Sequence, residues 1–207
     1  MYSERFYKLC RFVINIFYSP FKIIKINGDR TISAPSIIIC NHISLDDPLI
    51  LAHVFKTEPK YLSKKELFKN KFVSAFLTKL GCIPINRQAA DMSSMRQCIE
   101  CIKSGKSLIV FPEGTRMKGK RSKKEDAKGG IGLIAAATKA DIIPVSIFTK
   151  DYKSSLFKKT IVTIGSPIKF NTYINACEDK KDIGVFAFDF VEKQLIALEE
   201  SFDRHSN

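Results

Sequence analysis

Short apolar runs rich in β-branched residues most constrain how this 207-residue chain can fold. The runs that predict buried strands are Ser36–Cys40, Ile83–Ile85, Ser107–Phe111, Ile142–Phe148 and Ile161–Ile164. Segments with helical spacing of apolar residues lie between and after these runs, at Pro48–Phe55, Glu66–Leu80, Met92–Ile102, Gly129–Ala140 and Val185–Phe202. Strands that alternate with helices predict an α/β domain, with a central, mostly parallel or mixed β-sheet flanked by helices.

The composition fits one domain with a hydrophobic core and favours anionic partners. Hydrophobic residues make up 45% of the chain, and the formal net charge is +13. Such an excess attracts nucleic acid, an anionic membrane surface or a phosphorylated substrate, and charge alone does not choose among them. Cys98 and Cys101 form a lone C-x-x-C without a second pair at zinc spacing, so we expect ordinary packing and no metal.

Residues 1–27 are predicted to form a membrane-associating segment ahead of a catalytic domain at residues 28–207. No run of 18 apolar residues occurs, so no spanning helix is expected. From Phe6 to Phe17 the polar residues Lys8, Arg11 and Asn15 would form one narrow stripe on a helix. Such a helix can lie in the bilayer interface with its basic residues near lipid head groups, or it can pack as a core helix. We favour peripheral or monotopic attachment to the cytoplasmic face of a membrane.

Polar clusters that follow short strands are the candidate functional sites. The first runs from Asn41 to Asp47 and contains His42. Histidine titrates near neutrality, and a carboxylate five residues later can reach one imidazole nitrogen across a strand-to-helix turn. That contact would fix the tautomer and leave the other nitrogen to act as a general base. The spacing on its own is common in proteins.

Arginines close the other two clusters, which are Gly81–Arg87 and Phe111–Arg116. Guanidinium groups bind phosphate oxygens in pairs, so Arg87 and Arg116 could clamp one phosphate monoester. In a chain with 34 lysines and arginines, two solvated arginines are the plain alternative.

Together the clusters resemble the motifs of the 1-acyl-glycerol-3-phosphate acyltransferase family, the phospholipid and glycerol acyltransferases. The family's N-H-x-S-x-x-D is matched by Asn41–Asp47, and its F-P-E-G-T-R by Phe111–Arg116. Gly81–Arg87 and Ile142–Ser146 match its second and fourth motifs. The resemblance spans about residues 28–170. Asn86 departs from the pattern, because many members carry aspartate before the closing arginine.

The resemblance implies transfer of a fatty acyl group from acyl-CoA or acyl carrier protein to the sn-2 hydroxyl of 1-acyl-glycerol-3-phosphate (lysophosphatidic acid). The product would be phosphatidic acid, made without a cofactor or metal. His42 would be the general base and Asp47 would orient it. The remaining contacts implied are to the acceptor phosphate, from Arg87, Arg116, Lys64 and Lys65, and to its glycerol, from Glu113, Gly114 and Thr115.

Three alternatives remain open at this point. The motifs do not fix the acceptor, because pocket shape selects among lysolipids and glycerol 3-phosphate. A hydrolase using His42 and Asp47 would release fatty acid or phosphate without an acceptor. A basic nucleic-acid-binding domain fits the charge, but no helix-turn-helix, zinc finger or aromatic RNA-binding motif is visible, so no nucleic-acid partner is expected.

Overall fold

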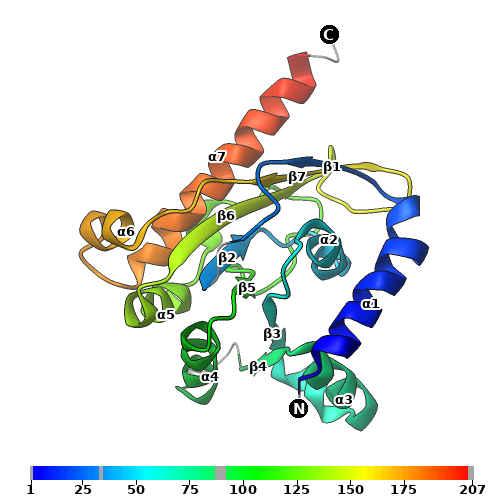
Figure 1. Ribbon diagram of the computed structural model, residues 1–207. Coiled ribbons are helices and arrows are strands. Elements are labelled where there is room, and N and C mark those ends of the chain that lie inside the picture. Colours follow the sequence, from blue (N-terminus) through cyan, green and yellow to red (C-terminus); the bar gives the residue numbers. More distant parts are fainter. Residues whose placement is uncertain (1, 33–34, 87–91, 205–207) are drawn as a thin grey trace.

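A seven-stranded sheet organises the computed structural model, which describes residues 2–32, 35–86 and 92–204 (Figure 1). The strands lie in the order β1-β7-β6-β2-β5-β3-β4. Their bounds are β1 Ile23–Asn27, β2 Ser36–Cys40, β3 Lys60–Lys64, β4 Ile83–Ile85, β5 Leu108–Val110, β6 Asp141–Phe148 and β7 Lys159–Ile164. Neighbouring strands run parallel except β6 and β7, which are antiparallel. The sheet is therefore mixed, and the predicted α/β class is confirmed.

Helices form two groups around this sheet (Figure 1). Their bounds are α1 Glu4–Phe17, α2 Asp47–Val54, α3 Lys71–Leu80, α4 Met92–Lys103, α5 Gly130–Thr138, α6 Phe170–Ala176 and α7 Asp182–Arg204. Helix α1 packs against α2 and α3, whereas α5 packs against α4, α6 and α7. Helix α7 also lies along β6. Short 3-10 turns occupy Ser19–Phe21, Lys65–Lys69 and Lys124–Asp126.

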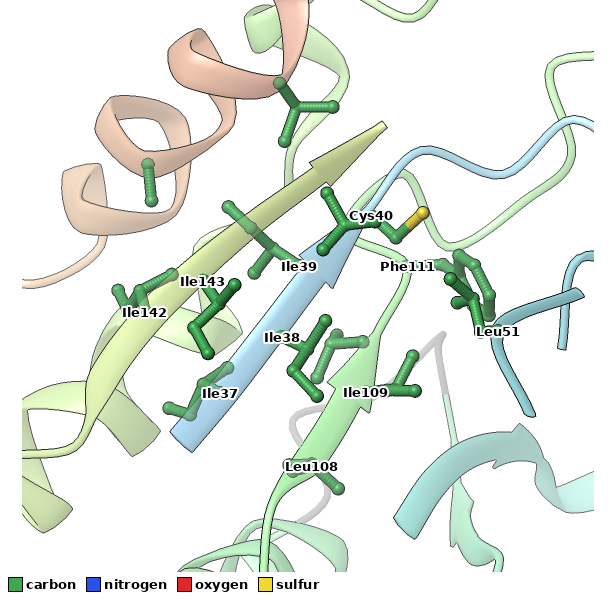
Figure 2. Packing of buried hydrophobic residues seen from close by; sticks show 14 of the residues in the cluster. Ile37, Ile38, Ile39, Cys40, Leu51, Leu108, Ile109, Phe111, Ile142 and Ile143 are labelled. Carbon is green, nitrogen blue, oxygen red and sulfur yellow. The ribbon is translucent and has the colours of Figure 1, made fainter. Parts of the chain in front are cut away.

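The core is centred on β2, whose side chains are buried on both faces of the sheet (Figure 2). Ile38 pairs in register with Ile109 of β5 on one side and with Ile143 of β6 on the other. A parallel strand covered on both faces needs apolar residues at every position, not at alternate ones. This requirement explains why β2 is an unbroken apolar run in the sequence.

Several elements differ from the sequence-based expectation. Strand β3 was not predicted, because its sequence KYLSK carries polar residues at three of five positions. Helix α6 was also missed. The predicted helix Glu66–Leu80 is divided, since the Asn70 side chain accepts hydrogen bonds from the amides of Phe72 and Val73 and so begins α3. Strand β1 lies within the predicted segment 1–27, yet it pairs with β7 in the sheet.

The polar stripe of α1 contacts the protein. Arg11 Nη1 donates to the carbonyl oxygens of Lys56 (2.8 Å) and Phe55 (3.4 Å), which follow α2. Asn15 Oδ1 lies 2.8 Å from His53 Nδ1 of α2. The sequence suggested that Arg11 lies near lipid head groups, but in the structure its guanidinium is bonded to backbone carbonyls of the domain. Among the described residues, no helix has the length and apolar character needed to cross a bilayer.

Candidate active site

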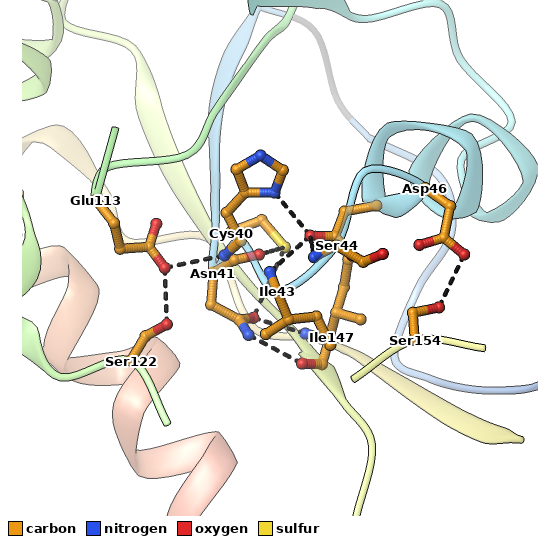
Figure 3. Close-up of polar contacts among 11 residues, drawn as sticks. Cys40, Asn41, Ile43, Ser44, Asp46, Glu113, Ser122, Ile147 and Ser154 are labelled. Carbon is orange, nitrogen blue, oxygen red and sulfur yellow. Dashed lines mark hydrogen bonds and ion pairs between the residues drawn. The ribbon is translucent and has the colours of Figure 1, made fainter. Parts of the chain in front are cut away.

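The first motif begins where β2 ends, and Asn41 fixes that end to the neighbouring strand (Figure 3). The buried Asn41 side chain donates from Nδ2 to the Ile147 carbonyl at 2.9 Å. Its Oδ1 accepts from the Ile147 amide at 2.7 Å. The amide side chain thus pairs with one residue of β6 as a backbone would. The following residue, His42, therefore starts from a fixed position at the sheet edge.

The structure brings His42 and Asp47 into direct contact. Asp47 is fully buried at the start of α2, and its Oδ2 lies 2.7 Å from His42 Nδ1. The same oxygen accepts from the backbone amides of Ile43 (2.7 Å) and Ser44 (2.8 Å). Because an ionised carboxylate only accepts, Nδ1 of His42 must carry the hydrogen. The neutral imidazole is then left with an unprotonated Nε2, which is the arrangement of a general base.

The third motif holds His42 from its other side. The Phe111 ring stacks on the imidazole, with centroids 4.3 Å apart and planes 22° from parallel. The amide of His42 donates to Glu113 Oε1 at 2.9 Å, and its carbonyl accepts from the Met117 amide at 2.8 Å. Ring and backbone are therefore both braced by the segment after β5.

Glu113 serves this brace, because its side chain is directed at the backbone of His42. It is 3% exposed, and Oε1 also accepts from the hydroxyl of Ser122 at 2.7 Å. The sequence had placed Glu113 in the glycerol pocket, but it is absent from the lining of the cavity next to His42. Ser122 is a site residue that sequence reasoning missed. A lone serine in a lysine-rich loop gives no signal that it is fully buried.

Two buried carboxylates thus flank His42. Burial raises the pKa of Asp47, against the opposing effect of hydrogen bonds from His42 and Ser44. Burial likewise raises the pKa of Glu113, against hydrogen bonds from His42 and Ser122. In each group the second oxygen, Oδ1 or Oε2, is buried without a hydrogen-bond partner among the described residues. An imidazolium formed at His42 would have compensating negative charge beside it.

A cavity of about 910 Å³ opens beside His42 and is lined mainly by apolar side chains. His42, Phe111, Thr115 and Arg116 contribute from the strand ends. Residues from α1, α2, β3 and α3 form the remaining walls, among them Leu9, Val13, Leu49, Ala52, Leu62, Phe76, Leu77 and Leu80. An apolar cavity with few polar groups at one end suits a ligand with a long hydrocarbon part and a polar reacting end.

Only some of the other predicted site residues lie at the cavity. Lys64 and Arg116 line the cavity, whereas Lys65 is exposed at the start of a 3-10 turn and does not. Arg87 lies outside the described residues. Gly114 has a φ of +68°, and a Cβ there would come within 3.3 Å of Lys128 Nζ. The Lys128 ammonium therefore lies close to the F-P-E-G-T-R turn. Among residues 2–32, 35–86 and 92–204, no group of metal-binding side chains gathers.

Comparison with known proteins agrees with this geometry. Residues 23–148 match the Acyltransferase family, which is more than half of the chain. The chain therefore belongs to the acyltransferase family, and the predicted family resemblance is confirmed. Its fold is similar to the crystal structure of the 1-acyl-sn-glycerophosphate (LPA) acyltransferase from Thermotoga maritima, at a TM-score of 0.67 and 22% identity. That match covers 95% of this chain and 78% of the other.

Three curated relatives share the name 1-acyl-sn-glycerol-3-phosphate acyltransferase. A 1-acyl-sn-glycerol-3-phosphate acyltransferase of Bacillus subtilis is 30% identical over 167 residues, covering 78% of this chain and 82% of its own length. The enzyme of the same name from Streptococcus pneumoniae is 36% identical over 114 residues, covering 53% and 40%. That from Borreliella burgdorferi is 31% identical over 153 residues, covering 72% and 59%. The chain thus spans most of the first relative and about half of the other two.

Proposed function

We propose that this chain acylates the sn-2 hydroxyl of 1-acyl-glycerol-3-phosphate, with acyl-CoA or acyl carrier protein as the donor. The product is phosphatidic acid, a precursor in phospholipid biosynthesis. The observation that carries the proposal is the contact between His42 Nδ1 and the buried Asp47 Oδ2, at the end of an apolar cavity. The names of the Bacillus, Streptococcus and Borreliella relatives support the choice of acceptor.

In the proposed reaction, Nε2 of His42 removes the proton of the acceptor hydroxyl as its oxygen attacks the thioester carbonyl. An ester C–O bond forms and the C–S bond breaks. The leaving thiolate takes the proton back from the imidazolium, so His42 is regenerated. Asp47 stabilises the imidazolium and keeps the ring oriented.

Direct transfer is favoured over a covalent acyl-enzyme. Cys40 is the thiol nearest in sequence to His42, but it is fully buried in β2, and burial raises its pKa well above the ordinary value. A buried thiol of raised pKa is a poor nucleophile, because the thiolate is the reactive form.

The acceptor phosphate is assigned to Arg116 and Lys64, which line the cavity, together with Arg87. Arg116 has no hydrogen-bond partner among the described residues, so its guanidinium is available for a phosphate. Thr115 is exposed at the same turn, where it can contact the glycerol. Charge-assisted hydrogen bonds of this kind contribute roughly 1.5–3 kcal/mol each.

The cytoplasmic face of an anionic membrane is the proposed location, with attachment through the outer face of α1. Phe12, Ile16 and Phe17 are between 46% and 69% exposed on this helix and do not line the cavity. With Arg11 and Asn15 bonded to the domain, the apolar side of α1 is left facing outward. Basic residues of a chain with net charge +13 add attraction to anionic lipid.

The deciding experiment is an acyl-transfer assay with lysophosphatidic acid and labelled acyl-CoA or acyl carrier protein, in which phosphatidic acid is measured. We expect product from the wild type and a loss of about 10²–10⁴-fold in His42→Ala, because general-base catalysis contributes that much. Arg116→Ala should raise the acceptor KM about tenfold to a hundredfold with a smaller change in kcat.

Other outcomes of this assay separate the alternatives. Release of free fatty acid without an acceptor would identify a hydrolase. Activity only with another lysolipid would replace the acceptor and keep the mechanism. A folded His42→Ala variant with full activity would refute the assigned base.

A further inference from the structure

One oxygen of Asp46 accepts from three donors, which belong to the connection between α1 and β1 and to the loop between β6 and β7. Oδ2 lies 2.7 Å from Nζ of Lys22, the residue that precedes β1. It also accepts from the hydroxyl of Tyr18, the residue that ends α1, at 2.5 Å. The third donor is the hydroxyl of Ser154, in the loop between β6 and β7, at 2.8 Å (Figure 3). None of these residues takes part in the mechanism described above.

The ammonium of this ion pair is fully hydrogen-bonded, whereas Asp46 Oδ1 is buried without a partner among the described residues. The side chain of Lys22 is 1% exposed, and Nζ also donates to Ser154 Oγ (2.6 Å) and to the Ser155 carbonyl (3.0 Å). A buried ammonium lowers folding stability unless it is paired and hydrogen-bonded. The positions of Lys22, Asp46 and Ser154 relative to one another are therefore constrained. Although burial alone would raise the pKa of Asp46, hydrogen bonds from Lys22, Ser44, Tyr18 and Ser154 hold this pKa well below its usual range. Asp46 is therefore ionised at neutral pH.

The backbone of Asp46 forms the start of the helix that presents Asp47. The Asp46 carbonyl accepts from the amides of Leu49 and Ile50, both at 2.9 Å. On the other side of Asp46, the turn at residues 43–44 donates its two amides to Asp47 Oδ2. The side chain of Asp46 thus anchors the turn between His42 and Asp47 from outside the cavity. No other side chain of this turn, apart from that of Asp47, makes a described ion pair.

We propose that Lys22 and Asp46 are positioning residues, which hold this turn so that Asp47 meets His42 Nδ1 at a productive distance. The inference rests on the proposed acyl transfer by His42. Neither residue lines the cavity, so neither is placed to contact a substrate bound there. Misplacing a catalytic group by about 1 Å costs on the order of 100-fold in rate. Loss of the pair therefore lowers kcat and leaves substrate binding nearly unchanged.

The test compares this pair with a matched ion pair in the same loop region. Lys158 Nζ lies 2.6 Å from Asp151 Oδ2, with side chains 52% and 43% exposed. In the lysophosphatidic acid assay, Lys22→Met and Asp46→Asn should lower kcat about tenfold to a hundredfold, with both KM values within about twofold. The double variant should be no slower than the worse single one, because the residues act as a unit. Lys22→Arg should retain part of kcat, and Lys158→Met should match the wild type.

A second readout does not depend on turnover. The NMR signal of the His42 Nδ1 proton reports its hydrogen bond to Asp47, and it should move or broaden in Lys22→Met but not in Lys158→Met. If the wild type lacks activity but this signal changes as expected, the proposed function fails and the positioning role stands. If Lys22→Met does not fold, Ser154→Ala replaces it, since this variant removes one donor without leaving a buried charge unpaired. The same fall in kcat and change in the His42 proton signal are expected, in the same direction and smaller. An unchanged kcat and an unchanged proton signal in folded variants would overturn the proposal.

Discussion

At the scale of single residues, the site keeps two carboxyl groups in surroundings that oppose their ionisation. Asp47 is 0% exposed and Glu113 is 3% exposed, and each leaves one oxygen without a described partner. Burial raises the pKa of both groups. The ionised forms therefore cost folding stability at neutral pH. In the proposed mechanism the same charges stabilise an imidazolium at His42, so stability and the proposed catalysis make opposite demands at this site.

The variant Glu113→Gln should reveal how much folding stability the ionised Glu113 carboxylate removes. For an acid whose folded pKa is raised, the folded state binds more protons than the unfolded state between the two pKa values. The stability due to Glu113 is therefore largest below its ordinary value of 4.5 and falls as pH rises toward the raised folded pKa. Glu113→Gln does not titrate, so its stability relative to the wild type should improve as pH rises above 4.5. Denaturant unfolding of both proteins across this range measures the difference.

Glu125→Gln is the matched control for this measurement, because Glu125 is an exposed glutamate in the 3-10 turn that follows Ser122. Its stability difference from the wild type should stay nearly flat over the same range. A Glu113→Gln variant whose relative stability falls with rising pH would mean that the carboxylate is stabilised in the fold, contrary to the burial argument.

At this scale the sequence predicted one contact of the site, between two residues that are close in the chain. His42 and Asp47 are five residues apart across one turn, so their contact follows from local geometry. The role of Glu113 did not follow, because its partners are a backbone amide in another strand-end loop and the buried Ser122. The position of Asp46 shortly before Pro48 indicates a helix start but gives no sign that its side chain has a buried partner. Its ion pair with Lys22 joins residues whose proximity depends on the whole sheet.

At the scale of elements, the sequence predicted the amphipathic character of α1 but not the way the helix is turned. A narrow polar stripe can face either solvent or backbone acceptors on the protein. Here Arg11 donates to the carbonyl oxygens of Phe55 and Lys56, which follow α2. With this side of α1 bonded to the domain, the apolar face is directed outward. Strand β3 was missed for a related reason, since Lys60 and Tyr61 are both buried although only one of them is apolar.

The outward face of α1 should control membrane binding. Phe12 and Phe17 are 60% and 69% exposed, and burying one such side chain is worth roughly 1.5–3 kcal/mol. The double variant Phe12→Ser/Phe17→Ser should therefore weaken binding to anionic vesicles at least about tenfold in a sedimentation assay. The wild type should also bind less in high salt, because screening removes the contribution of its positive charge.

The control for this prediction is Phe190→Ser, which removes a 37% exposed aromatic side chain from α7. Its vesicle binding should equal that of the wild type. Equal binding by the α1 variant would show that this helix is not the attachment surface.

At the scale of the whole molecule, fold class was predictable and the cavity was not. The α/β class follows from the alternation of strands and helices, which local sequence patterns reveal without any knowledge of tertiary contacts. The cavity needs α1, α2, β3 and α3 to meet the end of β5, so it exists only once distant segments have packed. Its apolar lining also looks like ordinary core residues in the sequence. Composition therefore could not reveal that these side chains enclose space.

The cavity should set the acyl chain length that the enzyme accepts. Ala52 of α2 is 7% exposed and lines the cavity, so Ala52→Leu would fill part of it. Each buried methylene contributes about 0.8 kcal/mol, so kcat/KM should fall about fourfold for every methylene of the donor that no longer fits. The preference should move to shorter donors, as measured by kcat/KM over a series of chain lengths. Ala136→Leu, on α5 and outside the cavity, should keep the wild-type profile. An unchanged profile in folded Ala52→Leu would place the acyl chain elsewhere.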